Sequence, residues 1–243
     1  MRLVLLTSLG VGGATVFGSL LGFAVKRIPK RFSDLTISFA AGIMLAAVWG
    51  LLAPAVESNS RAEVVKTVVF VVIGALFIGL CEAIVPKLRF VAGECGEAGE
   101  ADSVIMLALA MFIHNMPEGM AAGVSLGSGN LSGALAVAGG IALQNIPEGM
   151  AVIPPMLAVG MSKRRAFFIS LLTGMSEVGG TFLGYYATRL FSGMLIPSLA
   201  FAGGAMIYVI AAEMMPYVGE RGKLGAYVFV VGICLMMLFS ALI

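Results

Sequence analysis

Five carboxylates and one histidine lie within long apolar runs of this sequence, where an ionised side chain is costly. Placing one charge at a bilayer centre costs about 2.5–3.5 kcal/mol, so such residues mark function by default. No Lys or Arg lies well inside any of these runs, so the acids must be protonated, strongly hydrogen-bonded or neutralised by a visiting cation. The third alternative predicts a site for a transported cation. The six residues are Glu82, Glu118, Glu148, Glu177, Glu213 and His114, the only histidine of the chain.

Two of the acids belong to paired polar segments. His114 and Glu118 are four residues apart, and Gln144 and Glu148 repeat that spacing. On a helix, each pair lies on one face. A proline directly before each glutamate distorts the helix, which is tolerated where the backbone lines a cavity or is buried in protein. The pattern predicts one imidazole, two carboxylates and three carboxamides between two antiparallel helices, the carboxamides being those of Asn115, Gln144 and Asn145.

This ligand set suits a borderline divalent cation. Imidazole and carboxylate bind Zn²⁺ and Fe²⁺ well, whereas all-oxygen sites favour Mg²⁺, Ca²⁺ or Mn²⁺. Glu177 is the candidate to complete or bridge the site. Glu213, which lies three residues before Pro216, is a candidate residue of the transport pathway, and simple interfacial placement is its alternative explanation.

The elements that must position these residues are membrane-spanning helices. The chain of 243 residues is 60% hydrophobic and 12% charged, against about 25% charged in soluble domains. A span needs about 20 mostly apolar residues, so the length accommodates eight spans and little else. We expect an all-α, polytopic membrane protein with a single transmembrane transporter domain over residues 1–243. The spans are predicted at about 3–25, 34–56, 64–85, 102–127, 131–159, 164–190, 194–217 and 223–242.

Two internal repeats relate spans of opposite direction. His114-Asn-Met-Pro-Glu-Gly-Met-Ala recurs thirty residues later as Gln144-Asn-Ile-Pro-Glu-Gly-Met-Ala, with six of eight positions identical. The pattern Phe-Ala-x-Gly-x-Met followed by proline begins at Phe39 and again at Phe201, at an offset of 162. Inverted repeats with a proline-interrupted pair at the middle are typical of secondary transporters with a midplane site.

The basic residues predict the orientation. Eleven Lys and Arg fall in loops after the odd-numbered spans and four on the other side, so both termini are expected on the non-cytoplasmic side of the cell's inner (plasma) membrane. A formal charge of +2 gives no sign of nucleic-acid binding. Three separated cysteines without a C-x-x-C indicate neither a disulfide framework nor a thiolate zinc site.

The paired H-N-x-P-E-G and Q-N-x-P-E-G elements resemble those of the ZIP (Zrt- and Irt-like) metal-ion transporters, most similarly the bacterial GufA-type branch. The resemblance implies uptake of zinc, and also iron, manganese or cadmium, into the cytoplasm through a binuclear site. It also implies an elevator-like movement of spans 1, 4, 5 and 6 against the others, frequent homodimerisation, and no cofactor beyond the transported metal. By resemblance, one ion is held by His114, Glu118, Gln144 and Glu148, and the second by Asn115, Glu118, Asn145, Glu148 and Glu177.

Other classes of membrane protein would need different residues or would transport differently. An intramembrane metallohydrolase needs H-E-x-x-H, which a single histidine cannot supply, so we do not expect an enzyme. A proton-coupled carrier of organic cations would use the same buried acids, and a selective channel would differ in its flux. Both remain alternatives.

Overall fold

The computed structural model describes residues 1–24, 29–58, 60–91, 100–158, 160–191 and 193–243. Within these ranges, the side chains of 85–91, 100–108, 110, 111, 155 and 158 are not described. Lys26 and Arg27, which contribute to the predicted orientation, lie outside the described residues. So do the side chains of Lys87 and Arg89.

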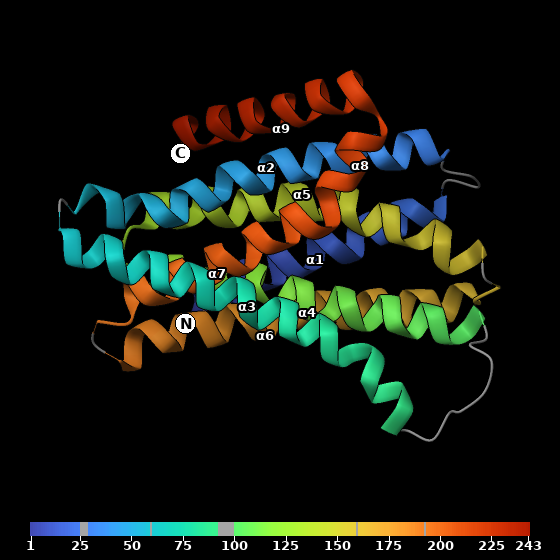
Figure 1. Ribbon diagram of the computed structural model, residues 1–243, viewed down its shortest axis with the longest axis horizontal. Helices are drawn as coiled ribbons and strands as arrows, with labels where there is room; N and C mark the ends of the chain where they lie inside the picture. Colours follow the sequence, from blue (N-terminus) through green and yellow to red (C-terminus); the bar gives the residue numbers. More distant parts are fainter. Residues whose placement is uncertain (25–28, 59, 92–99, 159, 192) are drawn as a thin grey trace.

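Throughout the described ranges, all regular structure is helical (Figure 1). Six segments are long and apolar enough to cross a membrane, namely α1, α2, α3 up to Ile84, α6, α9 and the run Leu195–Glu220. Helices α4 and α5, of 28 residues each, pack among them. The prediction of an all-α polytopic membrane protein is confirmed. The bounds are α1 Arg2–Ala24, α2 Lys30–Glu57, α3 Arg61–Val91, α4 Glu100–Gly127, α5 Leu131–Ala158, α6 Lys163–Leu190, α7 Leu195–Val209, η1 Ile210–Met214, α8 Met215–Glu220 and α9 Gly222–Leu242.

The run from α7 to α8 is not one uniform helix. Between them the chain makes one wide π-helical turn, Ile210–Met214. Pro216 lies two residues after the end of this turn and has no N–H to donate to the carbonyl four residues earlier. Such wide turns are frequent at functional sites. Here the turn carries Glu213.

The helices pack in a pattern that repeats within the bundle. Helix α1 packs along α5 as α6 packs along α4, and α2 packs along α9 as α3 packs along α7. In Figure 1, α9 lies beside α2 at the upper edge, and α3 lies at the opposite side near α7. The packing pattern is therefore preserved when each helix is exchanged for its counterpart in the other repeat, as inverted repeats require. The counterparts are α1 and α6, α2 and α7, α3 and α9, and α4 and α5.

Glycines at equivalent positions of the two repeats make equivalent helix–helix contacts. A Cβ at Gly18 of α1 would collide with the backbone of Ile146 in α5. A Cβ at Gly180 of α6, 162 residues later, would collide with Met116 of α4, thirty residues earlier than Ile146. Small residues at both sites let backbones approach closely, which is how helices associate in membranes. The same backbone contact is thus built twice.

A short turn sets α4 and α5 side by side in opposite directions. Only residues 128–130 connect them, and Gly129 has a φ of 84°, a conformation that glycine adopts without penalty. The side-chain Oδ1 of Asn130 accepts a hydrogen bond from the Gly133 N–H at 3.1 Å and caps the start of α5. The two proline-containing segments therefore meet within the bundle.

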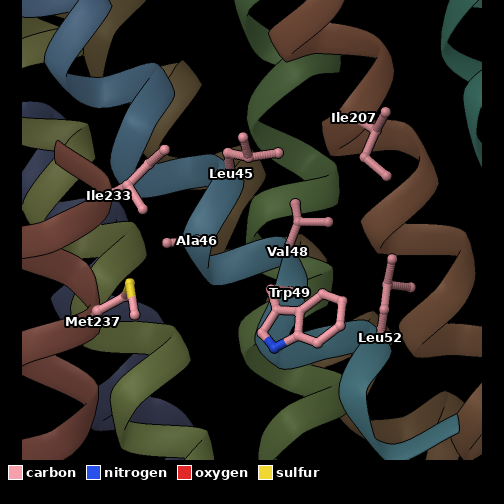
Figure 2. A pocket seen from close by; sticks show the side chains of 8 residues that line it. All are labelled: Leu45, Ala46, Val48, Trp49, Leu52, Ile207, Ile233 and Met237. Atoms are coloured by element: carbon pink, nitrogen blue, oxygen red, sulfur yellow. The ribbon is translucent and has the colours of Figure 1, made fainter. Parts of the chain in front are cut away.

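The outer surface has a different chemistry. A pocket of about 410 Å³ opens between α2, α7 and α9. Figure 2 shows its lining, which includes Leu45, Trp49, Ile207 and Met237 and contains no titratable side chain. The Trp49 side chain is 66% exposed. Such a surface suits acyl chains and has no ligand for a cation.

Candidate metal site

The seven residues predicted as metal ligands are all buried, on three helices at the centre of the bundle. Each is at most 8% exposed. Their contacts form two adjoining sets, one around Glu118 and one around Glu177. The predicted ligand residues are His114, Asn115 and Glu118 on α4, Gln144, Asn145 and Glu148 on α5, and Glu177 on α6.

The first set combines an imidazole with two carboxylates. One ligand atom each of His114, Glu118 and Glu148 lies within 4.8 Å of the others. The Nε2 of His114 is 3.4 Å from Glu148 Oε1. Gln144 donates from Nε2 to Glu118 Oε1 at 2.6 Å. These atoms can surround one cation with nitrogen and oxygen ligands of the kind that zinc accepts.

The second set is centred on the carboxylate of Glu177. Its Oε1 accepts hydrogen bonds from Asn115 Nδ2 and from Thr15 Oγ1, each at 2.5 Å. Its Oε2 accepts from Asn145 Nδ2 at 2.6 Å. Three helices, α1, α4 and α5, thus donate to one side chain of α6. A buried acid was expected to be protonated, strongly hydrogen-bonded or neutralised by a cation, and Glu177 is strongly hydrogen-bonded.

The two sets adjoin through a close backbone contact. Gly119 follows Glu118 in α4, and a Cβ there would collide with the backbone of Glu177. Gly149 follows Glu148 in α5 and packs in the same way against Thr15 of α1. The glycine of each P-E-G element therefore lets the neighbouring helix approach at the level of its glutamate.

The site also contains buried polar atoms without a hydrogen-bond partner. A carboxylate only accepts, so each amide must turn its nitrogen toward the acid, which leaves its oxygen unpaired. A buried polar atom without a partner costs about 1–3 kcal/mol, and a cation bound between the two helices would satisfy those of the atoms that face it. The unpaired atoms, one per residue, are His114 Nδ1, Asn115 Oδ1, Glu118 Oε2, Gln144 Oε1, Asn145 Oδ1 and Glu148 Oε2.

Glu213 lies next to this site, reached through the histidine. Its Oε2 is 3.4 Å from His114 Nδ1, and its side chain is 37% exposed. Nearby on α3, Glu82 Oε2 accepts a hydrogen bond from the hydroxyl of Tyr208 at 3.0 Å. The wide turn of η1 therefore brings a partly exposed carboxylate beside the buried imidazole.

None of the Lys and Arg side chains that the structure describes forms an ion pair with these acids. Three of them pair with acids elsewhere. Arg221 pairs with the buried Asp34, Lys30 with Glu220, and Lys66 with Glu63. In the described part of the chain, the polar partners of Glu118, Glu148 and Glu177 are therefore a histidine, three carboxamides and the hydroxyl of Thr15. Like charges in a volume of low dielectric repel strongly, and a divalent cation would relieve that repulsion.

One residue of the site was missed by sequence reasoning. Thr15 is 2% exposed and donates to Glu177, but threonine in a glycine-rich span is unremarkable. The offset of 162 between the repeats could have revealed this residue, because Thr15 is the repeat counterpart of Glu177.

One family match and three similar proteins bear on this arrangement. Residues 93–240 match the family described as ZIP Zinc transporter. The chain is 36% identical to "Zinc transporter GufA" of Myxococcus xanthus, over 87% of each chain. It is 31% identical to "Zinc transporter ZIPB" of Bordetella bronchiseptica, over 86% of this chain and 70% of the relative. It is also 31% identical to "Zinc transporter ZupT" of Chlorobaculum parvum, over 87% of this chain and 86% of the relative.

Proposed function

This chain belongs to the ZIP zinc transporter family, and we propose on that premise that it moves divalent metal ions, zinc first, across a membrane. Its role is then transport rather than catalysis. Iron, manganese and cadmium are further candidate substrates, since nitrogen and oxygen ligands accept them as well.

The six unpaired atoms carry this proposal. They come from six different residues on two antiparallel helices, and all six are cation ligands by chemical type. A site for an organic cation would instead need room and apolar or aromatic walls around the ammonium group. A hydrogen-bonded structural cluster would pair these atoms with one another.

The two sets support two adjoining ions. His114, Glu118, Gln144 and Glu148 would hold one ion. The second would use Asn115, Asn145 and Glu177, with Glu118 and Glu148 bridging. Three carboxylates offset most of the charge of two divalent ions. The neutral carboxamide oxygens are weak ligands, which suits a site that must release what it binds.

The glycine contacts support movement of one group of helices against the other. Glycine-to-backbone contacts join α1, α4, α5 and α6 to one another, as at Gly12 with Gly174 and Gly119 with Glu177. Others join α2 to α9 and α3 to α7, as at Gly42 with Phe229 and Gly74 with Phe201.

Across the boundary between the two groups, the contacts are of a different kind. Gly139 and Gly140 of α5 meet the side chains of Phe239 and Met236 of α9, and Gly50 of α2 meets the side chain of Val137. Flexible side chains can slide and repack, whereas interlocked backbones cannot. The site lies wholly in the first group and would move with it, giving alternating access without ATP.

The remaining features follow from the basic residues and from the family. Loops after the odd-numbered spans are rich in Lys and Arg, which favours an orientation with both termini outside the cytoplasm. Membership of the family supports uptake into the cytoplasm across the plasma membrane. We also propose a homodimer.

The test is zinc uptake by the purified chain in proteoliposomes, with a bulky organic cation offered in parallel. We expect saturable zinc uptake that the organic cation does not inhibit. A matched control is Glu63→Ala, which removes an acid of an exposed ion pair far from the site and should transport normally. Transport of the organic cation without zinc would contradict the proposal, and so would zinc flux that never saturates.

A further inference from the structure

We infer that Thr15 of α1 is a positioning residue of the metal site, which fixes the carboxylate of Glu177 so that the Asn115 and Asn145 oxygens face the ion. The inference rests on the proposed function. It adds a fourth helix to a site whose other residues come from α4, α5 and α6.

The hydroxyl of Thr15 is used differently from those of other buried helical threonines. A threonine in a helix commonly bonds back to a carbonyl three or four residues earlier in the same helix. Thr173 donates to Ile169 O at 2.8 Å, and Thr181 to Glu177 O at 2.8 Å. Thr15 instead reaches across to Glu177 Oε1, 162 residues away in the chain. Its hydroxyl is therefore committed to the site.

Glu177 in turn decides how the two asparagines are oriented. Each asparagine donates from Nδ2 to one oxygen of this carboxylate, and Asn145 Nδ2 also donates to the Val11 carbonyl at the longer distance of 3.4 Å. Each Oδ1 is unpaired. If the carboxylate rotates, both amides lose this acceptor, and Asn145 keeps only the longer bond to Val11. Thr15 and Asn115 hold Oε1 from two sides, so removal of the Thr15 hydroxyl leaves that oxygen with one donor.

The effect should be confined to one of the two ions. In the described structure, His114, Gln144 and Glu118 make no hydrogen bond to Thr15 or Glu177. Loss of the Thr15 hydroxyl therefore weakens the ion next to Glu177 and spares the ion next to His114. A general packing defect in α1 would weaken both.

The repeat explains why a threonine fits here. Thr15 occupies the position in α1 that Glu177 occupies in α6, so a second glutamate would oppose the first at short range. A hydroxyl provides a donor without adding charge. The side chains at these two equivalent positions meet at the site, one as donor and one as acceptor.

The experiment compares Thr15→Val, which keeps the shape, with Thr15→Ser, which restores the hydroxyl. Thr173→Val is the matched control, because it makes the same chemical change on a buried threonine that bonds only carbonyls of its own helix, those of Ile169 and Ser170. Zn²⁺ and Cd²⁺ are titrated calorimetrically into the purified full chain. We expect Thr15→Val to weaken the Glu177-side ion about 10- to 100-fold, the usual cost of losing a partner of a metal ligand. The other ion should keep its affinity, and Thr15→Ser and Thr173→Val should resemble the parent chain.

A double-variant cycle separates positioning from packing. Once Glu177→Gln has removed the charged acceptor, adding Thr15→Val should change metal affinity less than twofold if Thr15 acts through Glu177. Unchanged affinities in Thr15→Val overturn the inference, as do equal losses in Thr173→Val, no rescue by Thr15→Ser, or full additivity in the cycle. A parent chain that binds no zinc contradicts the proposed function itself, so zinc binding by the parent chain is measured before any variant is made.

Discussion

The two halves of the site share a backbone framework and differ in ligand chemistry. Asn115 and Glu118 in α4 have identical counterparts in Asn145 and Glu148 of α5. The imidazole of His114, by contrast, corresponds to the carboxamide of Gln144. Glu177 of α6 corresponds to Thr15 of α1. The α4–α6 half thus supplies the only nitrogen ligand and the third carboxylate, while the α5–α1 half supplies their neutral counterparts.

The two repeats also differ beside the site, at the position of Glu213. Glu213 lies in the wide turn η1 and contacts His114 at 3.4 Å. Its counterpart 162 residues earlier is Leu51, which lies in the regular helix α2 and is buried among apolar side chains. Symmetric packing therefore positions the candidate site, and broken symmetry places a partly exposed carboxylate beside it, for which we propose a role in the approach of the ion. The comparison can be tested with substitutions that make the two halves of the site chemically alike, or with the same substitution at equivalent positions of both halves.

The largest effect is expected from the two equivalent glutamates. Glu118→Ala and Glu148→Ala should each lower zinc uptake by at least about 100-fold, since each removes a charged ligand shared by both ions. Equal losses would show that the halves are equivalent at this position. Initial rates of ⁶⁵Zn uptake in proteoliposomes measure them, and normal uptake by either variant would contradict the bridging role.

Next come the glycines that bring the helices together. Gly119→Ala and Gly149→Ala should each lower the free energy of unfolding by about 1–3 kcal/mol, because the added Cβ overlaps the backbone of Glu177 or Thr15. Gly179→Ala is the control, since a Cβ there has open space. Thermal unfolding in detergent reports the difference. A control as damaged as the two variants would refute the packing explanation.

A smaller change is expected when the ligands are made alike. His114→Gln should shift preference from Zn²⁺ toward Mn²⁺ by about 10-fold, because an all-oxygen site favours harder ions. Gln144→His should move the preference the opposite way. Competition between the two ions for uptake measures both variants, and an unchanged selectivity profile in both would show that the imidazole is not a ligand.

The smallest effect should come from the polar approach. Glu213→Gln keeps size and polarity but removes the charge, so uptake should slow about two- to fivefold while equilibrium binding at the buried site stays unchanged, as for a residue that speeds passage by attracting the ion. Rates and calorimetry on the same preparation separate the two. A loss of affinity as large as that of Glu118→Ala would make Glu213 a ligand of the resting site instead.

The sequence was informative wherever function depends on spacing along one helix. His114 with Glu118, and Gln144 with Glu148, are four residues apart, and helical periodicity alone puts each pair on one face. Buried acids amid apolar runs also stand out, because the cost of burying a charge makes them rare. For the same reasons the all-α membrane fold could be recognised from composition and run length.

The tertiary structure decided what depends on contacts between helices. The hydrogen bond from Thr15 to Glu177 joins residues 162 apart, and local periodicity carries no information about such a pair. The direction in which each amide turns depends on which carboxylate lies opposite, and the wide turn that presents Glu213 depends on packing around Pro216. Residue types and spacing along each helix thus determined which groups could bind a metal, whereas close backbone packing at glycines decided which of those groups meet.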